Sequence, residues 1–181
     1  MSYVDEAFYE ELVRGFSRWP DLEDADPALR EPCRALLHRE ARLLDQGRFE
    51  DWLALYSEAC IYWVPGTPGG DPRREVAVAF DDRRRLEDRI YRLRTGHAWS
   101  QWPASRTVRI VSNVEVFPGL ADGLMVRSNF LTTDWRAGET RFWSGWCGHR
   151  LRRRQDRLEI EVRQVNLVDC DPNLRNPSLI L

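Results

Sequence analysis

The sequence predicts an α+β fold, in which a run of helices is followed by a mostly antiparallel sheet. Up to residue 95, apolar side chains recur mainly at helical spacing, whereas from Ser105 onward they alternate with polar side chains. Turn residues divide the alternating part into four long strands. Helices in one part of a chain and strands in another are typical of α+β proteins. A chain of 181 residues is long enough to form one domain with a substantial core.

The N-terminal segment predicts an amphipathic helix over residues 5–19, ended by Pro20. Its apolar face carries Phe8, Leu12, Phe16 and Trp19. Residues 21–32 are acidic and include two prolines, which predicts a loop or a short helical turn. We therefore expect residues 1–33 to be an extension that docks on its own domain or on a neighbour, and residues 34–181 to be the main domain.

Two helices and two short strands are predicted next. Residues 34–56 contain two helical stretches that break at Asp45-Gln46-Gly47, where Gly47 fits a left-handed helix cap. Residues 60–65 and 76–80 predict short strands on either side of a loop rich in glycine and proline.

A short helix is predicted after residue 80, with a narrow apolar stripe formed by Leu86, Ile90 and Leu93. Asp81 and Asp82 suit its N-terminus. Arg89 falls on the same stripe, so its charge requires a carboxylate or carbonyl partner. We expect Asp82, Arg89 and Arg106 to take part in buried ion pairs that fix the fold.

The alternation in the long strands predicts which side chains share a face. The predicted sets are Val108, Ile110, Ser112, Val114 and Val116; Leu124, Val126, Ser128, Phe130 and Thr132; and Trp143, Cys147 and Leu151. In the last strand Arg163 alternates on the polar side, and the apolar phase shifts between Val162 and Val165, which predicts a bulge and a strongly curved sheet. A curved sheet wrapped on its concave side by N-terminal helices resembles the cone of the nuclear-transport-factor-2-like (NTF2-like) superfamily.

Bulk properties narrow the functional classes. The net charge of −2 argues against a nucleic-acid-binding protein, and the arginines at 150 and 152–154 fit a solvated hairpin tip. No apolar run is long enough for a membrane span, and no signal peptide is visible. The four cysteines lack CxxC spacing, so we expect reduced thiols in a cytoplasmic protein.

An ordered set of motifs occupies residues 38–56, 61–65, 81–99, 103–107, 112–114 and 173–181. Together they resemble the small (β) subunit of bacterial aromatic-ring-hydroxylating dioxygenases, over residues 34–181. The sequence departs from the family pattern at Cys60, Gln101-Trp102 and Ala104. These departures concern local contacts rather than membership.

The resemblance implies a structural subunit that carries no cofactor or metal of its own. A partner α subunit would hold a Rieske [2Fe-2S] cluster and a mononuclear Fe(II), in an α3β3 hexamer that adds both atoms of O2 to an aromatic ring. Contacts between β subunits, and a homotrimer of β alone, are also expected. Within the matching motifs, the structural or interface candidates are Asp82, Arg89, Trp99, Ser105, Arg106 and Asn113.

The chain's own residues do not predict an iron site. A Rieske site needs two cysteines and two histidines, and Cys147-Gly148-His149 supplies half of one such motif. The three histidines lie far apart in the sequence, which predicts surface or core-edge positions for each: His38, His97 and His149.

An alternative is a self-contained lyase or isomerase on the same cone. Its acid–base pocket would use Asp45, Tyr62, Asp82 and His97. This alternative requires an open cone, and tryptophans filling the cone would exclude it; the candidates for filling it are Trp63, Trp143 and Trp146.

Overall fold

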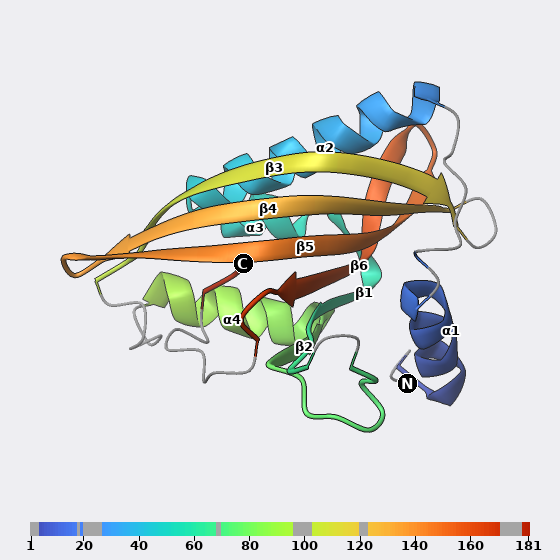
Figure 1. Ribbon diagram of the computed structural model, residues 1–181, viewed down its shortest axis with the longest axis horizontal. Helices are drawn as coiled ribbons and strands as arrows, with labels where there is room; N and C mark the ends of the chain where they lie inside the picture. The colour runs from blue at the N-terminus through green and yellow to red at the C-terminus, as the bar shows by residue number, and fades with distance from the viewer. Residues whose placement is uncertain are drawn as a thin grey trace.

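One curved six-stranded sheet organises the computed structural model, which describes residues 4–17, 19, 27–67, 70–95, 103–119, 123–170 and 179–181. The strands are β1 (Tyr56–Val64), β2 (Ala79–Asp82), β3 (Arg106–Pro118), β4 (Leu124–Arg136), β5 (Glu139–Arg154) and β6 (Arg157–Leu167). Their order is β2-β1-β6-β5-β4-β3, and every pair is antiparallel except β1–β6. The predicted α+β class and the mostly antiparallel sheet are confirmed (Figure 1).

In the described part of the chain, four helices lie on the two faces of this sheet: α1 (Glu6–Ser17), α2 (Pro27–Asp45), α3 (Phe49–Leu53) and α4 (Arg83–Thr95). We call the face covered by α2, α3 and α4 the inner face, because their apolar residues form one cluster with the strands. Helix α1 packs on the opposite, outer face with a second cluster. Figure 1 shows α1 set apart from the other helices. Helix α1, which was expected to dock on its own domain or on a neighbour, therefore lies on the face opposite to the other helices.

Helix α1 docks on its own chain. Phe16 and Trp19 pack edge-to-face against each other, and Phe16 contacts Trp63 of β1 in the same way. Gly148 of β5 leaves room for both rings, because a Cβ there would lie 2.7 Å from Trp19 and 2.9 Å from Phe16. An ion pair between Glu11 and Arg150, at 2.8 Å, adds a polar contact.

The end of α2 agrees with the sequence prediction, whereas its start does not. Gly47 adopts a φ of 65° after α2, as its left-handed cap requires. Helix α2, however, begins at Pro27, so residues 27–32 are helical rather than a loop or a single turn. Pro27 occupies the first helical position, where no backbone N–H is needed, and Pro32 lies inside the helix.

Bulges on β6 and β3 set which side chains of these two strands face inward. On β6 the pairing steps from Arg150↔Val162 to Leu151↔Ile160, which leaves Glu161 unpaired. The predicted bulge exists, but it precedes Val162, so Val162 packs on the outer face and Arg163 turns into the inner core. This corrects the expectation that Arg163 lies on the polar side.

The second bulge, on β3, was not predicted. The pairing steps from Ser112↔Asn129 to Glu115↔Arg127, and Asn113 has a positive φ of 50° within the step. The bulge puts Val114 and Val116 with the inner cluster, whereas Val108 and Ile110 are 65% and 57% exposed on the outer face. The expectation that these valines and Ile110 share one face is therefore wrong.

Candidate functional site

A buried carboxylate, Glu40 of α2, organises the inner core. Its Oε1 accepts hydrogen bonds from Tyr56 Oη at 2.8 Å, Trp52 Nε1 at 3.1 Å and Arg163 Nη1 at 3.2 Å. Its Oε2 lies 3.1 Å from His149 Nε2. Glu40 is 2% exposed, and the five side chains join α2, α3, β1, β5 and β6 into one network.

The charges of this network are fixed by their mutual contacts. Burial alone raises the pKa of Glu40, but the charge of Arg163 and the hydrogen bonds from His149 and Tyr56 outweigh it and lower the pKa to about 2. Burial likewise lowers the pKa of Arg163, but Glu40 reverses the effect and raises it. Burial and the nearby Glu40 raise the pKa of Tyr56 well above its ordinary value, so Tyr56 is a neutral hydrogen-bond donor.

Cys147 and His149 lie on the inner face of β5 and contact different members of this network. The Cys147 Sγ lies 4.0 Å from Arg163 Nη2, and His149 pairs with Glu40. A guanidinium beside the thiol opposes binding of a metal cation, so these residues do not fit half of a Rieske site. Within the described part of the chain, no group of three or more histidine, cysteine or acidic residues could hold a metal ion. His38 is exposed as predicted, whereas His149, 1% exposed, is a core residue, which corrects its expected surface or core-edge position.

A second polar cluster fixes the end of α2 to β3. Asp45 accepts hydrogen bonds from Thr107 Oγ1 at 2.9 Å, Arg109 N at 2.9 Å and Arg109 Nη1 at 2.5 Å. Arg109 also donates from Nη2 to the carbonyl of Ile180. Asp45 is thus held by structural partners, which does not suit the general base that the enzyme alternative requires.

The remaining residues of that alternative do not form an open acid–base pocket. Tyr62 is 1% exposed, and its hydroxyl accepts a hydrogen bond from Leu181 N at 3.1 Å. Asp82 lies at the start of α4, and His97 is outside the described residues. Trp143 packs in the inner core, whereas Trp63 and Trp146 pack on the outer face beside α1.

The predicted ion pair at α4 forms with a different carboxylate. Arg89 Nε donates to Asp81 Oδ2 at 3.0 Å, with both side chains largely buried. Asp82 instead caps α4, because its Oδ1 accepts a hydrogen bond from Arg85 N at 2.9 Å. The expected partner of Arg89 is therefore present, but one residue earlier than Asp82.

The other motif residues occupy separate places. Arg106 is exposed, and its guanidinium lies 4.0 Å from the centre of the Trp135 ring, so it does not form the expected buried ion pair with any described residue. Asn113 marks the β3 bulge. Ser105 lines a cavity of about 140 Å³ at the end of α2, and its buried Oγ has no hydrogen-bond partner among the described residues. Trp99 lies outside the described residues.

The outer face of β3, β4 and β5 carries an exposed apolar surface beyond α1. We call it the outer patch, with its exposed fractions: Val108 (65%), Ile110 (57%), Leu131 (37%), Trp135 (37%) and Phe142 (66%). Val108 and Phe142 flank Thr133 in register, and Ile110 pairs with Leu131, so these side chains are neighbours. Contiguous exposed apolar surface of this kind marks an interaction site.

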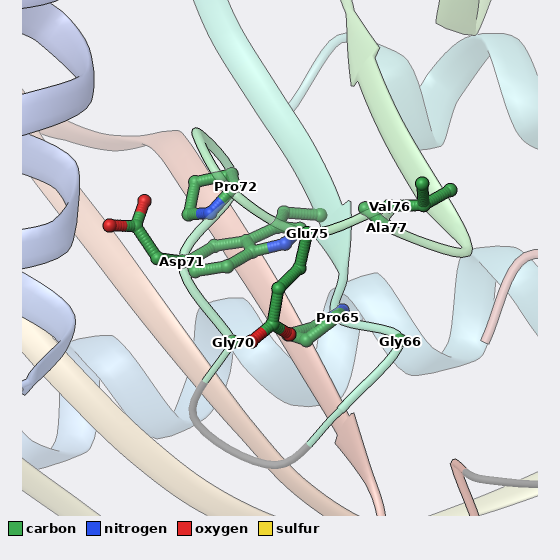
Figure 2. A pocket seen from close by; sticks show the side chains of 9 residues that line it. Pro65, Gly66, Gly70, Asp71, Pro72, Glu75, Val76 and Ala77 are labelled. Atoms are coloured by element: carbon green, nitrogen blue, oxygen red, sulfur yellow. The ribbon is translucent and has the colours of Figure 1, made fainter.

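The loop over residues 65–77 borders a cleft that carries no site. Figure 2 shows Asp71 and Glu75 with their carboxylates directed away from each other. Asp71 accepts hydrogen bonds from Arg73, and Glu75 accepts one from Thr67, so the loop satisfies both. The cleft leaves no room for a water molecule.

Arg150, Arg152 and Arg154 of β5 are each paired with acids. Arg150 contacts Glu11 and Glu161, and Arg152 contacts Glu159 and Glu161. This pairing agrees with a solvated hairpin and does not favour a phosphate-binding surface. Among the described residues, no helix is long and apolar enough to cross a membrane.

Comparison with known proteins identifies the family. Residues 39–171 match the family described as "Ring hydroxylating beta subunit". The chain belongs to this family. It is 37% identical to the small oxygenase component of the p-cumate 2,3-dioxygenase system of Pseudomonas putida, over 76% of this chain and 78% of that one. The resemblance inferred from the motifs is confirmed.

Solved structures agree with the fold of this β subunit. The β subunit of benzoate 1,2-dioxygenase from Burkholderia mallei is 25% identical, with a TM-score of 0.67. The alignment covers 86% of this chain and 99% of that chain. A chain of naphthalene 1,2-dioxygenase shares the fold at 22% identity and a TM-score of 0.75, and the alignment covers 98% of this chain and 95% of that chain. The NTF2-like cone is therefore the fold of this chain.

Glu40, His149 and Arg163 were missed as a cluster by the sequence reading. Glu40 lies between Leu37 and Leu44 at helical spacing on α2, and this spacing indicates that its side chain shares their buried face. No signal in the sequence shows that Arg163 faces inward, because the bulge at Glu161, two residues earlier, decides it.

Proposed function

We propose that this chain is the non-catalytic β subunit of a multicomponent aromatic-ring-hydroxylating dioxygenase and holds its catalytic α subunits in an α3β3 hexamer. Membership of the β-subunit family supports the role. The observation that carries it is the Glu40 network, whose polar groups pair with one another around a cavity of only about 20 Å³ at the centre of the inner core. An aromatic substrate needs several times that volume.

The chemistry would belong to the α subunit. That partner would hold the Rieske [2Fe-2S] cluster and mononuclear Fe(II), and would add both atoms of O2 to an aromatic ring to give a cis-dihydrodiol. The two electrons that balance this reaction would come from NAD(P)H. We place the complex in the cytoplasm, where the buried thiols of this chain stay reduced.

The outer patch is the surface that we assign to contact between β subunits. The outward residues of β3 from Arg106 to Ser112, and those paired with them on β4 and β5, include no carboxylate. Arg106 is the cation at this end, and it already stacks on Trp135. Three copies of such a surface can meet around a three-fold axis with little like-charge repulsion. A homotrimer of the isolated chain is the assembly that we expect.

Copurification tests the role as a partner of an α subunit, and a separate mass measurement tests the contact between β subunits. Expressed with a Rieske-type α subunit encoded beside it, the chain should copurify and support ring dihydroxylation. Dihydroxylation by the chain alone, or failure to copurify, would refute the structural role.

The assembly of the chain alone is measured by light scattering coupled to gel filtration. The wild type should be a trimer, and Val108→Asp in the outer patch should give a monomer. Val76→Asp is the matched control, because Val76 is 92% exposed and lies in a loop outside the patch. A wild-type monomer, or equal behaviour of the two variants, would exclude the outer patch as the β–β contact.

A further inference from the structure

A small cavity lies between α2 and strands β3 to β6, next to the Glu40 network. It has a volume of about 20 Å³, enough for one water molecule. Four residues on its wall each carry a buried polar atom with no hydrogen-bond partner among the described residues: Arg109 Nε, Thr132 Oγ1, His149 Nδ1 and Arg163 Nε. Buried polar atoms are almost always hydrogen-bonded to protein or to ordered water, so four of them around one cavity require an explanation.

These atoms are deeply buried. Thr132 is 0% exposed, His149 1% and Arg163 5%, and the side chain of Arg109 is 4% exposed. Bulk solvent therefore does not satisfy them. Each charge on the wall already has a partner, since Arg109 pairs with Asp45 and Arg163 with Glu40.

The donor and acceptor character of the four atoms defines their ligand. The Nε–H groups of Arg109 and Arg163 can only donate. His149 Nε2 lies 3.1 Å from the ionised Glu40 carboxylate, and in the tautomer that donates from Nε2 the Nδ1 atom accepts. The Thr132 hydroxyl both donates and accepts. A ligand for this set must accept from two groups and donate to at least one.

We propose that this cavity is a binding site for one buried water molecule. The water accepts hydrogen bonds from Arg109 and Arg163 and donates to His149 and Thr132, which uses its full capacity of two donated and two accepted bonds. An anion such as chloride fits less well, because it cannot donate to His149 and because both arginines are already neutralised. The water joins the Asp45 cluster to the Glu40 network, and so links the end of α2 to β6 through one continuous set of polar contacts.

A crystal structure of the wild-type protein at better than about 2 Å resolution tests the site directly, since ordered water is well defined there. The expected result is one water peak within about 3.2 Å of both arginine Nε atoms. A bromide soak distinguishes the anion. An anomalous peak in the cavity, or a cavity with no density, would overturn the proposal.

A pair of adjacent threonines on β4 gives the matched test in solution. Thr132→Val removes one partner of the water, whereas Thr133→Val makes the same change on the outer face. Oxygen-17 relaxation dispersion counts long-lived internal waters in each protein. We expect Thr132→Val to lose the signal of one water, and to lower the Tm by about 2–4 °C relative to Thr133→Val. An equal signal in both variants would contradict the proposal.

Discussion

Replacing Glu40 by glutamine keeps the shape of the side chain and removes its charge. Arg163 then remains as a buried cation without a counterion. Because the folded protein lowers the pKa of Glu40 from 4.5 to about 2, the ionised carboxylate stabilises the fold. A shift of one pKa unit corresponds to about 1.4 kcal/mol, so the lowered pKa of Glu40 contributes about 3 kcal/mol to the free energy of unfolding. This agrees with the roughly 3–5 kcal/mol that removing one partner of a buried ion pair typically costs.

The effect has a defined pH dependence. A carboxylate whose pKa is lowered on folding stabilises the protein fully above its unfolded pKa of 4.5, and this stabilisation is lost as the pH falls through about 2. Glu40→Gln should therefore unfold about 3 kcal/mol more easily than the wild type at pH 7, and the gap should close between pH 4.5 and pH 2.

Urea denaturation followed by tryptophan fluorescence measures both quantities. Glu58→Gln, at an exposed position of β1, is the control and should stay within about 0.5 kcal/mol of the wild type. If Glu40→Gln matched this control at pH 7, or if the gap stayed constant as the pH fell, Glu40 would not be the ionised centre of the network.

Three further predictions concern separate parts of the fold. Asp81→Asn or Arg89→Met alone should lower the free energy of unfolding by about 3 kcal/mol, and the double variant should recover part of it; additive losses in urea denaturation would show that the pair is uncoupled. Asn113→Val should lower stability by about 1–2 kcal/mol in thermal denaturation, because its positive φ disfavours a β-branched residue, whereas Asn113→Gly should be nearly neutral. Gly148→Ala should displace α1 by collision with Trp19 and speed proteolysis near the N-terminus; unchanged cleavage would mean that α1 is not docked there.

Patterns confined to one element were predictable from the sequence. The order of helices and strands, the cap at Gly47 and the buried carboxylate partner of Arg89 all follow from spacing along one segment. The combined motifs also indicated the family, which the match over residues 39–171 confirms.

The features that were missed depend on strand register. A single extra residue reverses the side chains that follow it relative to those before it, so Glu161 decides that Arg163 is inside, and the bulge at Asn113 puts Val114 on the face opposite to Ile110. The Glu40 network brings together residues more than 100 positions apart, such as His149, and no local pattern records such a contact.

The parallel pairing of β1 with β6 has a consequence for the order of folding. Strand β1 spans Tyr56–Val64, and apart from the short β2 its neighbour in the sheet is β6, Arg157–Leu167. During synthesis, β1 therefore cannot pair with β6 until nearly the whole chain has been made. Contacts of such long sequence separation slow folding and leave apolar strands exposed meanwhile. Chains truncated before residue 157 would consequently aggregate rather than form a smaller stable domain, and expression should be sensitive to chaperone supply.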